Sequence, residues 1–232
     1  RRRARRSLVN RRAPRPAVLH GELAQLSEAC SQGGCTVVDA TAAGAGRDPA
    51  GLLSLSGSTG VKVVMAASCT AEQVAGAVAR ARGEADGDGE MDAGGGQQAV
   101  DARASSLLAD LLLAELTDGL AVPGRAEAVR AGILTAGDLL APLAAAAGAA
   151  ATDPPDPALR ASDIVLRALG QAQMRSLAPL LCPLPAAIHA SSSAAAGAEQ
   201  SAAVRMARRL IECGAKPASL VLGHAQNLLL SP

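Results

Sequence analysis

The sequence predicts an α/β fold, a partial (β/α)8 barrel of the TIM type with about five to six βα units present and strands seven and eight missing. Short β-branched apolar runs recur along the chain, and segments with helical spacing of apolar residues separate them. The runs are continuous rather than alternating, which is typical of strands buried on both faces. Repeated strand–helix–strand units favour a parallel sheet with right-handed crossovers.

The first part of the chain shows this rhythm most clearly. A helix is predicted over residues 21–32, where leucines recur at helical spacing, and a strand over 35–41. Asp48 precedes a proline, the arrangement of an N-cap followed by the first helical residue, and predicts a helix that ends near Thr59. The next strand is predicted over 61–67.

The second part continues the pattern with weaker signals. Helices are predicted at 105–119, 158–174 and 199–213, and strands at 128–134, 177–182 and 219–224. The stub around Leu8–Val9 could form a sixth strand. A closed barrel of this kind has eight strands, so the predicted set would leave an open sheet edge. Because an unpaired edge invites pairing with another chain, self-association through it is expected.

Low-complexity segments interrupt the predicted domain, which spans residues 17–232. Glycine, alanine, serine and aspartate dominate three stretches that have little to bury, and these are predicted to be inserts. The inserts lie at about 81–104, 141–157 and 186–198. Residues 1–16 form a separate tail with eight arginines and no acid. Its composition fits either an organelle transit segment or a disordered basic tail.

Composition excludes several functional classes. The formal net charge is +1 and the chain has no Phe, Tyr or Trp, so bases would have no aromatic side chain to stack on, and no nucleic-acid partner is expected. No apolar run approaches the length of a membrane span, so no membrane association is expected. Five cysteines without a CxxC pair predict an intracellular, reducing compartment, cytoplasmic, or organellar if the tail is a transit segment.

The missing aromatic residues also bear on stability. Aromatic side chains bury the most area per residue, so a core of Ala, Val, Leu, Ile and Met gains less from burial, at roughly 25 cal/mol per Å² of apolar surface. We therefore expect low stability, cavities in the core and pockets without aromatic walls.

Residues 37–68 carry three motifs that resemble a known family. They read VVDATAAGAGRDPAGLLSLSGSTGVKVVMAAS, with a Val-Asp-x-Thr strand end, a Gly-Arg-Asp-Pro helix start and a Thr-Gly-Val turn before an apolar strand. This is similar to the second and third βα units of the phosphotriesterase-related proteins, binuclear-metal hydrolases of the amidohydrolase superfamily. Three further segments agree in order: LADLLLAELTDGL with VRAGIL, ALRASDIVLRALGQAQ, and ARRLIECGAKPASLVLGH. The resemblance covers about residues 21–224.

The resemblance implies a pair of zinc ions, or of similar divalent metals, held at the strand ends, and a small-molecule substrate such as an ester, lactone or phosphoester. Two ions would share a hydroxide and polarise the scissile bond. In the family a His-x-His pair ends strand one, a bridging lysine or glutamate ends strand four, and single histidines end strands five and six. An aspartate near strand eight helps to activate the bridging water, and its position would lie beyond Pro232.

Most of these positions do not match. The His-x-His pair falls on Asn10 and Arg12, the bridging position at about Ala136, and the fifth-strand histidine near Pro183. His224, at the end of VLGH, is the one residue that matches, and it is the predicted metal ligand. Asp138 could serve as the bridging group only if its strand slipped by two residues, and His189 lies six residues past its expected place.

Other residues near the strand ends have two interpretations each. Asp39 could face a site, but in the family it resembles a scaffold residue. Cys182 could bind zinc as a thiolate or be a small buried apolar side chain. Arg130 could form an ion pair below the barrel mouth or a structural one elsewhere, and His20, like His189, is expected to face solvent.

Three functional hypotheses follow. The first is a phosphotriesterase-related metallohydrolase-like protein, degenerate or truncated and inactive as given. The second is a non-catalytic binding or scaffold protein on the same half-barrel. The third is an incomplete gene product without a stable fold.

Overall fold

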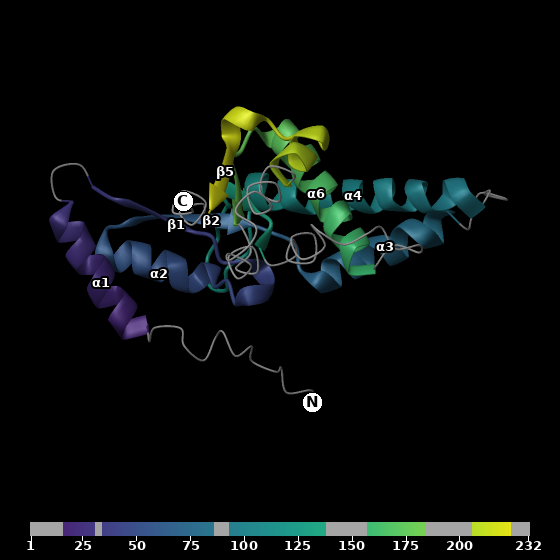
Figure 1. Ribbon diagram of the computed structural model, residues 1–232. Helices are drawn as coiled ribbons and strands as arrows, with labels where there is room; N and C mark the ends of the chain where they lie inside the picture. The colour runs from purple at the N-terminus through teal and green to yellow at the C-terminus, as the bar shows by residue number, and fades with distance from the viewer. Residues whose placement is uncertain (1–15, 31–33, 86–92, 138–156, 184–205, 224–232) are drawn as a thin grey trace, which may run out of the picture.

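A computed structural model describes residues 16–30, 34–85, 93–137, 157–183 and 206–223 of the chain. Its five strands form one parallel sheet in the order β1-β2-β3-β4-β5, which curls into a half-barrel with flanking helices (Figure 1). The strands are β1 (Thr36–Asp39), β2 (Lys62–Ala67), β3 (Ile133–Thr135), β4 (Leu180–Pro183) and β5 (Leu220–Gly223). The predicted partial TIM-type barrel is therefore confirmed, and a strand overlaps each of the five predicted ranges. The strand predicted at 128–134 begins only at Ile133, and the strand predicted at 177–182 begins at Leu180. Leu8–Val9 lies outside the described residues.

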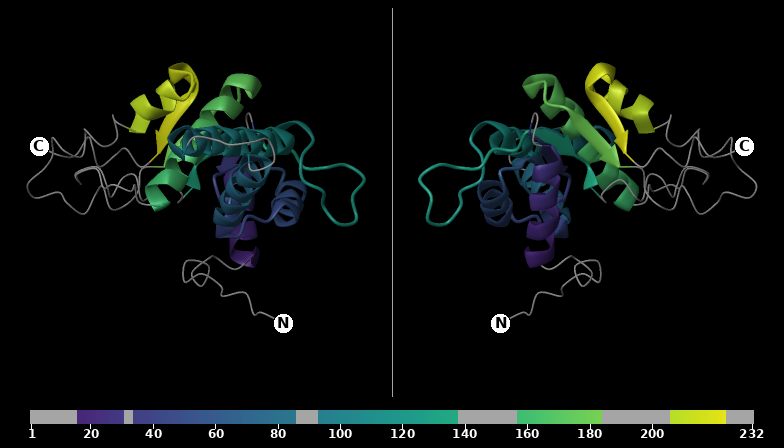
Figure 2. Two further views of the ribbon diagram at one scale, coloured as in Figure 1. Left: turned by 90° about the vertical axis from the view of Figure 1, so that its right-hand side faces the viewer. Right: turned by 90° about the vertical axis from the view of Figure 1, so that its left-hand side faces the viewer.

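The helices follow the strands as a βα pattern requires. They are α1 (Pro16–Ala29), α2 (Pro49–Thr59), α3 (Ala71–Ala85), α4 (Ala93–Thr117), α6 (Pro157–Ser176) and a helix whose described part spans 206–212, with short 3-10 turns η2 (Ala43–Ala45) and η5 (Pro217–Ser219). Helix α4 packs on both α3 and α6. The connection between α4 and β3 projects from the body as a loop (Figure 2).

The N-terminal cap of α2 is as predicted. The Asp48 side chain accepts a hydrogen bond from the Gly51 amide at 3.0 Å, and Pro49 is the first helical residue. Gly60 ends the helix in the left-handed conformation, with φ of 72°, which a side chain would disfavour. The turn aims the chain directly into β2, which pairs with β1 in a register that places Val38 beside Val64.

Within the stretch 81–104, predicted to be an insert, residues 81–85 and 93–104 are helical. Alanine is the strongest helix former, and Ala81, Val100 and Ala104 are buried in the core. Helix α3 was not predicted from the sequence at all. Its signal is a capping box, in which the Thr70 amide donates to Gln73 Oε1 at 2.7 Å and the Gln73 amide donates to Thr70 Oγ1 at 3.1 Å.

The remaining predicted boundaries are only partly described. The inserts at 141–157 and 186–198 lie outside the described residues, except for Pro157, which opens α6. Helix α1 begins at Pro16, five residues before the predicted start at 21.

The core lies between the sheet and helices α4 and α6. It consists of aliphatic side chains, and several leucines and isoleucines in it are fully buried: Leu108, Leu112, Leu134, Ile164, Leu166, Leu169, Leu180 and Leu210. Val38 on β1 and Val221 on β5 are half exposed on the two edge strands. Association through an open edge stays a prediction. No helix in the described part of the chain is both long and apolar enough to cross a membrane.

Candidate functional site

Parallel α/β barrels place their active sites at the carboxyl ends of the strands. All five strands are paired in parallel, so their carboxyl ends lie along one rim of the half-barrel. In register, Pro183 at the end of β4 lies beside Gly223 at the end of β5. The site is therefore built from the residues that end each strand and the first residues that follow.

At the end of β1, the carboxylate of Asp39 is used locally. Its Oδ1 accepts hydrogen bonds from the Thr41 hydroxyl at 2.6 Å and from the Thr41 amide at 3.3 Å. This is the geometry of an Asx turn, which fixes the path of the chain as it leaves the strand. The hydrogen bonds fit the scaffold interpretation of Asp39.

The end of β2 is held by a buried hydroxyl that sequence reasoning missed. Ser68 is 1% exposed, and its Oγ accepts a hydrogen bond from the Ala43 amide at 2.7 Å, which ties η2 to β2. Next to it, burial raises the pKa of the Cys69 thiol to about 12, with a smaller contribution from the negative charge of Glu115. Cys69 is therefore a neutral thiol at physiological pH, unsuited to nucleophilic attack.

The end of β3 is where the resemblance implies the bridging metal ligand. Thr135 is fully buried, and its hydroxyl accepts a hydrogen bond from the Gly137 amide at 3.4 Å. Ala136 is 2% exposed and presents only a methyl group. Neither side chain can bridge two cations. Asp138, the alternative candidate, lies outside the described residues.

The end of β4 is apolar. Cys182 is fully buried, with its Sγ 3.2 Å from the Sδ of Met206, and burial raises the pKa of its thiol to about 12. Full burial beside Met206 fits the interpretation of Cys182 as a small apolar side chain. Pro183, near the expected histidine position, ends the strand.

His224 directly follows β5 and lies outside the described residues, as do Asn10, Arg12 and His189. Its role as a metal ligand stays a prediction. His20 is exposed on α1, as expected.

The described strand ends do not fit a pair of divalent metals. Such a pair needs several imidazole, carboxylate or lysine-derived ligands. The described ends offer one carboxylate engaged in a turn, the hydroxyls of Thr41, Ser68 and Thr135, and two buried cysteines on different strands. Within the described ranges, no three His, Cys, Asp or Glu side chains lie close enough together to hold a metal ion.

The buried ion pair near the rim involves a residue other than the one singled out in the sequence. Arg130 is exposed and forms no ion pair with a described residue. Arg47 instead binds Glu115 through both guanidinium nitrogens, at 2.7 and 3.0 Å, and also donates to the carbonyl oxygen of Ala66 on β2. Their side chains are 5% and 13% exposed.

No family model and no curated protein matches the chain. Solved structures do match. One similar structure comes from work on organophosphate hydrolysis activity engineered from a weak promiscuous lactonase template. Its TM-score is 0.54 at 19% sequence identity, and the match covers 93% of this chain and 52% of that one. An organophosphorus hydrolase mutant from Deinococcus radiodurans has a TM-score of 0.53 and 21% identity, covering 92% and 51%.

The phosphotriesterase homology protein from Escherichia coli, in complex with phosphate, is similar with a TM-score of 0.54 and 16% identity, covering 91% of this chain and 54% of that one. At such identities the likeness shows the fold alone. The chain spans about half the length of these structures, and the fold that it shares with them is that of phosphotriesterase-like hydrolases.

Proposed function

We propose that this chain is a phosphotriesterase-like half-barrel whose strand ends no longer carry a two-metal centre, so that the polypeptide as given does not hydrolyse esters, lactones or phosphoesters. The fold shared with organophosphorus hydrolases and a lactonase template supports the ancestry. The residues at the strand ends support the loss of activity.

The observation that carries this proposal is the end of β3. A two-metal hydrolase holds both ions with one bridging ligand, and its removal leaves each ion with fewer bonds. Here the two residues at that place, Thr135 and Ala136, are buried and have no carboxylate, imidazole or amine. Cys182, at the end of β4, is fully buried and packs against Met206, and no described cluster of three His, Cys, Asp or Glu side chains that could hold a metal ion includes it.

The test is hydrolysis by the purified full chain after incubation with zinc, manganese or cobalt salts. The substrates are paraoxon, p-nitrophenyl acetate and a γ-lactone, followed by absorbance or pH indicator. We expect rates equal to those of the metal salts alone. Mass spectrometry of metals after gel filtration should find fewer than one tightly bound ion per chain.

His224→Ala and His20→Ala form the matched pair for this experiment. Both remove one imidazole, but His20 lies exposed on α1, away from the strand ends. Metal-dependent hydrolysis that His224→Ala abolishes and His20→Ala leaves intact would show that the chain retains a catalytic centre, and the proposal would be wrong. Equal loss of bound metal in both variants would indicate surface binding only.

The second candidate is a non-catalytic binding protein on the same half-barrel. A groove between α3 and α6, lined almost wholly by apolar side chains, favours it. A cooperative thermal transition followed by circular dichroism would separate both candidates from a gene product without a stable fold.

A further inference from the structure

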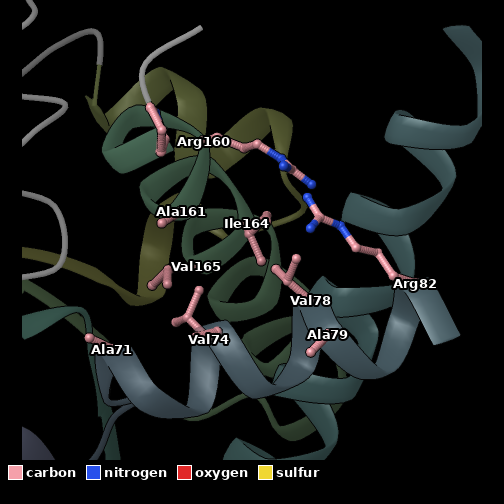
Figure 3. Close-up of a pocket in the computed structure, with 11 residues that line it drawn as sticks. Ala71, Val74, Val78, Ala79, Arg82, Arg160, Ala161, Ile164 and Val165 are labelled. Atoms are coloured by element: carbon pink, nitrogen blue, oxygen red, sulfur yellow. The ribbon is translucent and has the colours of Figure 1, made fainter. Parts of the chain in front are cut away.

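Helices α3 and α6 enclose an apolar groove of about 390 Å³ (Figure 3). Both helices pack on α4, and the groove runs between them. Its apolar lining includes Val74, Val78, Ala79, Ala161, Ile164 and Val165. Most of the lining side chains are alanine or valine, so the walls are close to the helix backbones and the groove has no aromatic ring. Its volume lies within the range of about 300–1,000 Å³ that small-molecule sites occupy.

One end of the groove carries positive charge. Arg82 from α3 and Arg160 from α6 both line it, and their guanidinium groups point toward one another (Figure 3). Arg160 binds Asp101 through Nε at 2.9 Å and Nη2 at 2.5 Å. Arg82 is exposed and forms no ion pair with any residue that the structure describes. Two guanidinium groups thus face each other (Figure 3), and the one carboxylate among the described residues that is shown to bind either of them, Asp101, comes from α4.

The N-terminus of α6 lies at the groove. The helix begins at Pro157, which lines the groove; its first turn has no acidic residue, and Asp156 directly precedes it in the sequence. The aligned peptide dipoles of a helix this long place partial positive charge at that end. An anion there would reduce the repulsion between Arg82 and Arg160 and complement the helix terminus.

We propose that this groove binds an unbranched alkyl carboxylate, with the carboxylate between Arg82 and Arg160 and the alkyl chain along the apolar walls between α3 and α6. The walls are aliphatic and offer neither an aromatic ring for stacking nor a polar side chain other than the two arginines, which suits a plain alkyl chain. The paired guanidinium groups select an anionic head over a neutral or cationic one. The inference is independent of the proposed loss of hydrolysis, because the groove lies between helices and requires no metal, and it gives the second candidate function a ligand class.

The test is titration of the full chain with decanoate, octanoate and hexanoate below their micelle concentrations, by calorimetry in buffer with EDTA. Affinity should rise by about fourfold for each added CH2 group, the factor expected when a methylene leaves water. Decylamine, with the same chain and a cationic head, should not bind. No heat with decanoate at millimolar concentration would overturn the proposal, as would equal binding of decylamine.

Two variants locate the head and the chain. Arg82→Gln should weaken decanoate binding by about tenfold or more, since it removes a charged hydrogen-bond donor. Arg208→Gln removes the same charge from an exposed position outside the groove and should leave binding unchanged. Ala75→Glu places a bulky anion on an exposed part of the wall and should abolish binding. Ala79→Leu narrows the groove without a charge and should weaken binding, with shorter acids affected less.

Unchanged affinity in Arg82→Gln, with the circular dichroism spectrum of the wild type, would exclude the proposed head position. An equal loss in Arg82→Gln and Arg208→Gln would show that only net charge matters. Either result would refute the proposed site.

Discussion

Arg47 and Glu115, 68 positions apart in the chain, form a two-pronged ion pair at 2.7 and 3.0 Å in the interior of the half-barrel. The same guanidinium group donates to the carbonyl oxygen of Ala66. One side chain thereby joins the loop after β1, the last turns of α4 and strand β2. The pair connects three elements that no local sequence signal brings together.

Arg47→Met should lower the free energy of unfolding by about 3–5 kcal/mol, because it leaves a buried carboxylate without its partner. Urea unfolding measures the effect. The control is Arg175→Met, since Arg175 binds Asp110 at 2.6 Å with both side chains more than half exposed. That change should cost less than about 1 kcal/mol. The double variant Arg47→Met, Glu115→Leu should recover part of the lost stability. If the single variant Arg47→Met lost no more stability than Arg175→Met, a strong buried ion pair between Arg47 and Glu115 would be contradicted.

Gly170→Ala should destabilise the chain by about 1–3 kcal/mol through overpacking. An added Cβ at Gly170 would lie 2.2 Å from the carbonyl oxygen of Cys213, where α6 meets the turn after the helix at 206–212. The matched change is Gly76→Ala on α3, where a Cβ would meet nothing within 4 Å. There the same substitution should raise stability by about 0.5–1 kcal/mol. Thermal and urea unfolding of both variants test the close approach, and an equal response would contradict it.

Gln173→Ala should lower the free energy of unfolding by about 2–4 kcal/mol, because the Gln173 side chain is fully buried and forms the hydrogen bonds of two backbone groups. Its Oε1 accepts from the Lys216 amide at 2.7 Å and its Nε2 donates to the Ser219 carbonyl oxygen at 3.0 Å. Gln171→Ala, two residues away on the same helix, removes only an exposed contact with Ser106. It should change stability by less than about 0.5 kcal/mol. Hydrogen exchange of the Lys216 amide should accelerate only in Gln173→Ala.

Stability should fall as pH rises from about 9 toward 12. Burial raises the pKa of Cys69 and of Cys182 to about 12, whereas an unperturbed thiol titrates near 9.0. Between these values the unfolded chain has released protons that the folded chain retains, so each thiol lowers stability by up to about 1.4 kcal/mol per pH unit. Below pH 9 both states keep these protons, and the effect is absent.

Urea unfolding between pH 8 and 10.5 tests this dependence. Cys69→Ala and Cys182→Ala should each reduce the slope with which the free energy of unfolding falls as pH rises. Val122→Ala removes buried volume without a thiol, and it should lower stability without changing the slope. A slope unaffected by either cysteine variant would show that these thiols titrate normally.

The sequence predicted best those elements whose first and last residues are marked by local capping signals. The Asp48 cap, the proline after it and Gly60 define α2 without reference to the rest of the chain. The apolar run that forms β2 was also predicted from its own residues, and its second half, from Met65 to Ala67, is buried. By contrast, the glycine- and alanine-rich stretch at 81–104 was predicted to be an insert, although its alanines allow the close packing of α3 on α4.

The candidate site was predicted less completely, because its groups come from distant parts of the chain. The sequence analysis placed Ala136 and Pro183 at two positions where the resemblance implies metal ligands. Neither side chain has an atom that binds a metal, so the mismatch could be predicted without the structure. It did not indicate that Ser68 would hold Ala43, or that Arg82 and Arg160 would face each other. Those relations depend on crossovers that bring separate helices together.

The sequence by itself determined the parallel α/β class, the approximate positions of the five strands along the chain and the side chains near their ends, because hydrophobic periodicity and helix caps act over a few residues. Tertiary structure alone decided the protonated state of Cys69 and Cys182, the partner of Arg47 and the groove between α3 and α6. Burial and long-range contacts set these properties, and both arise only when the elements pack.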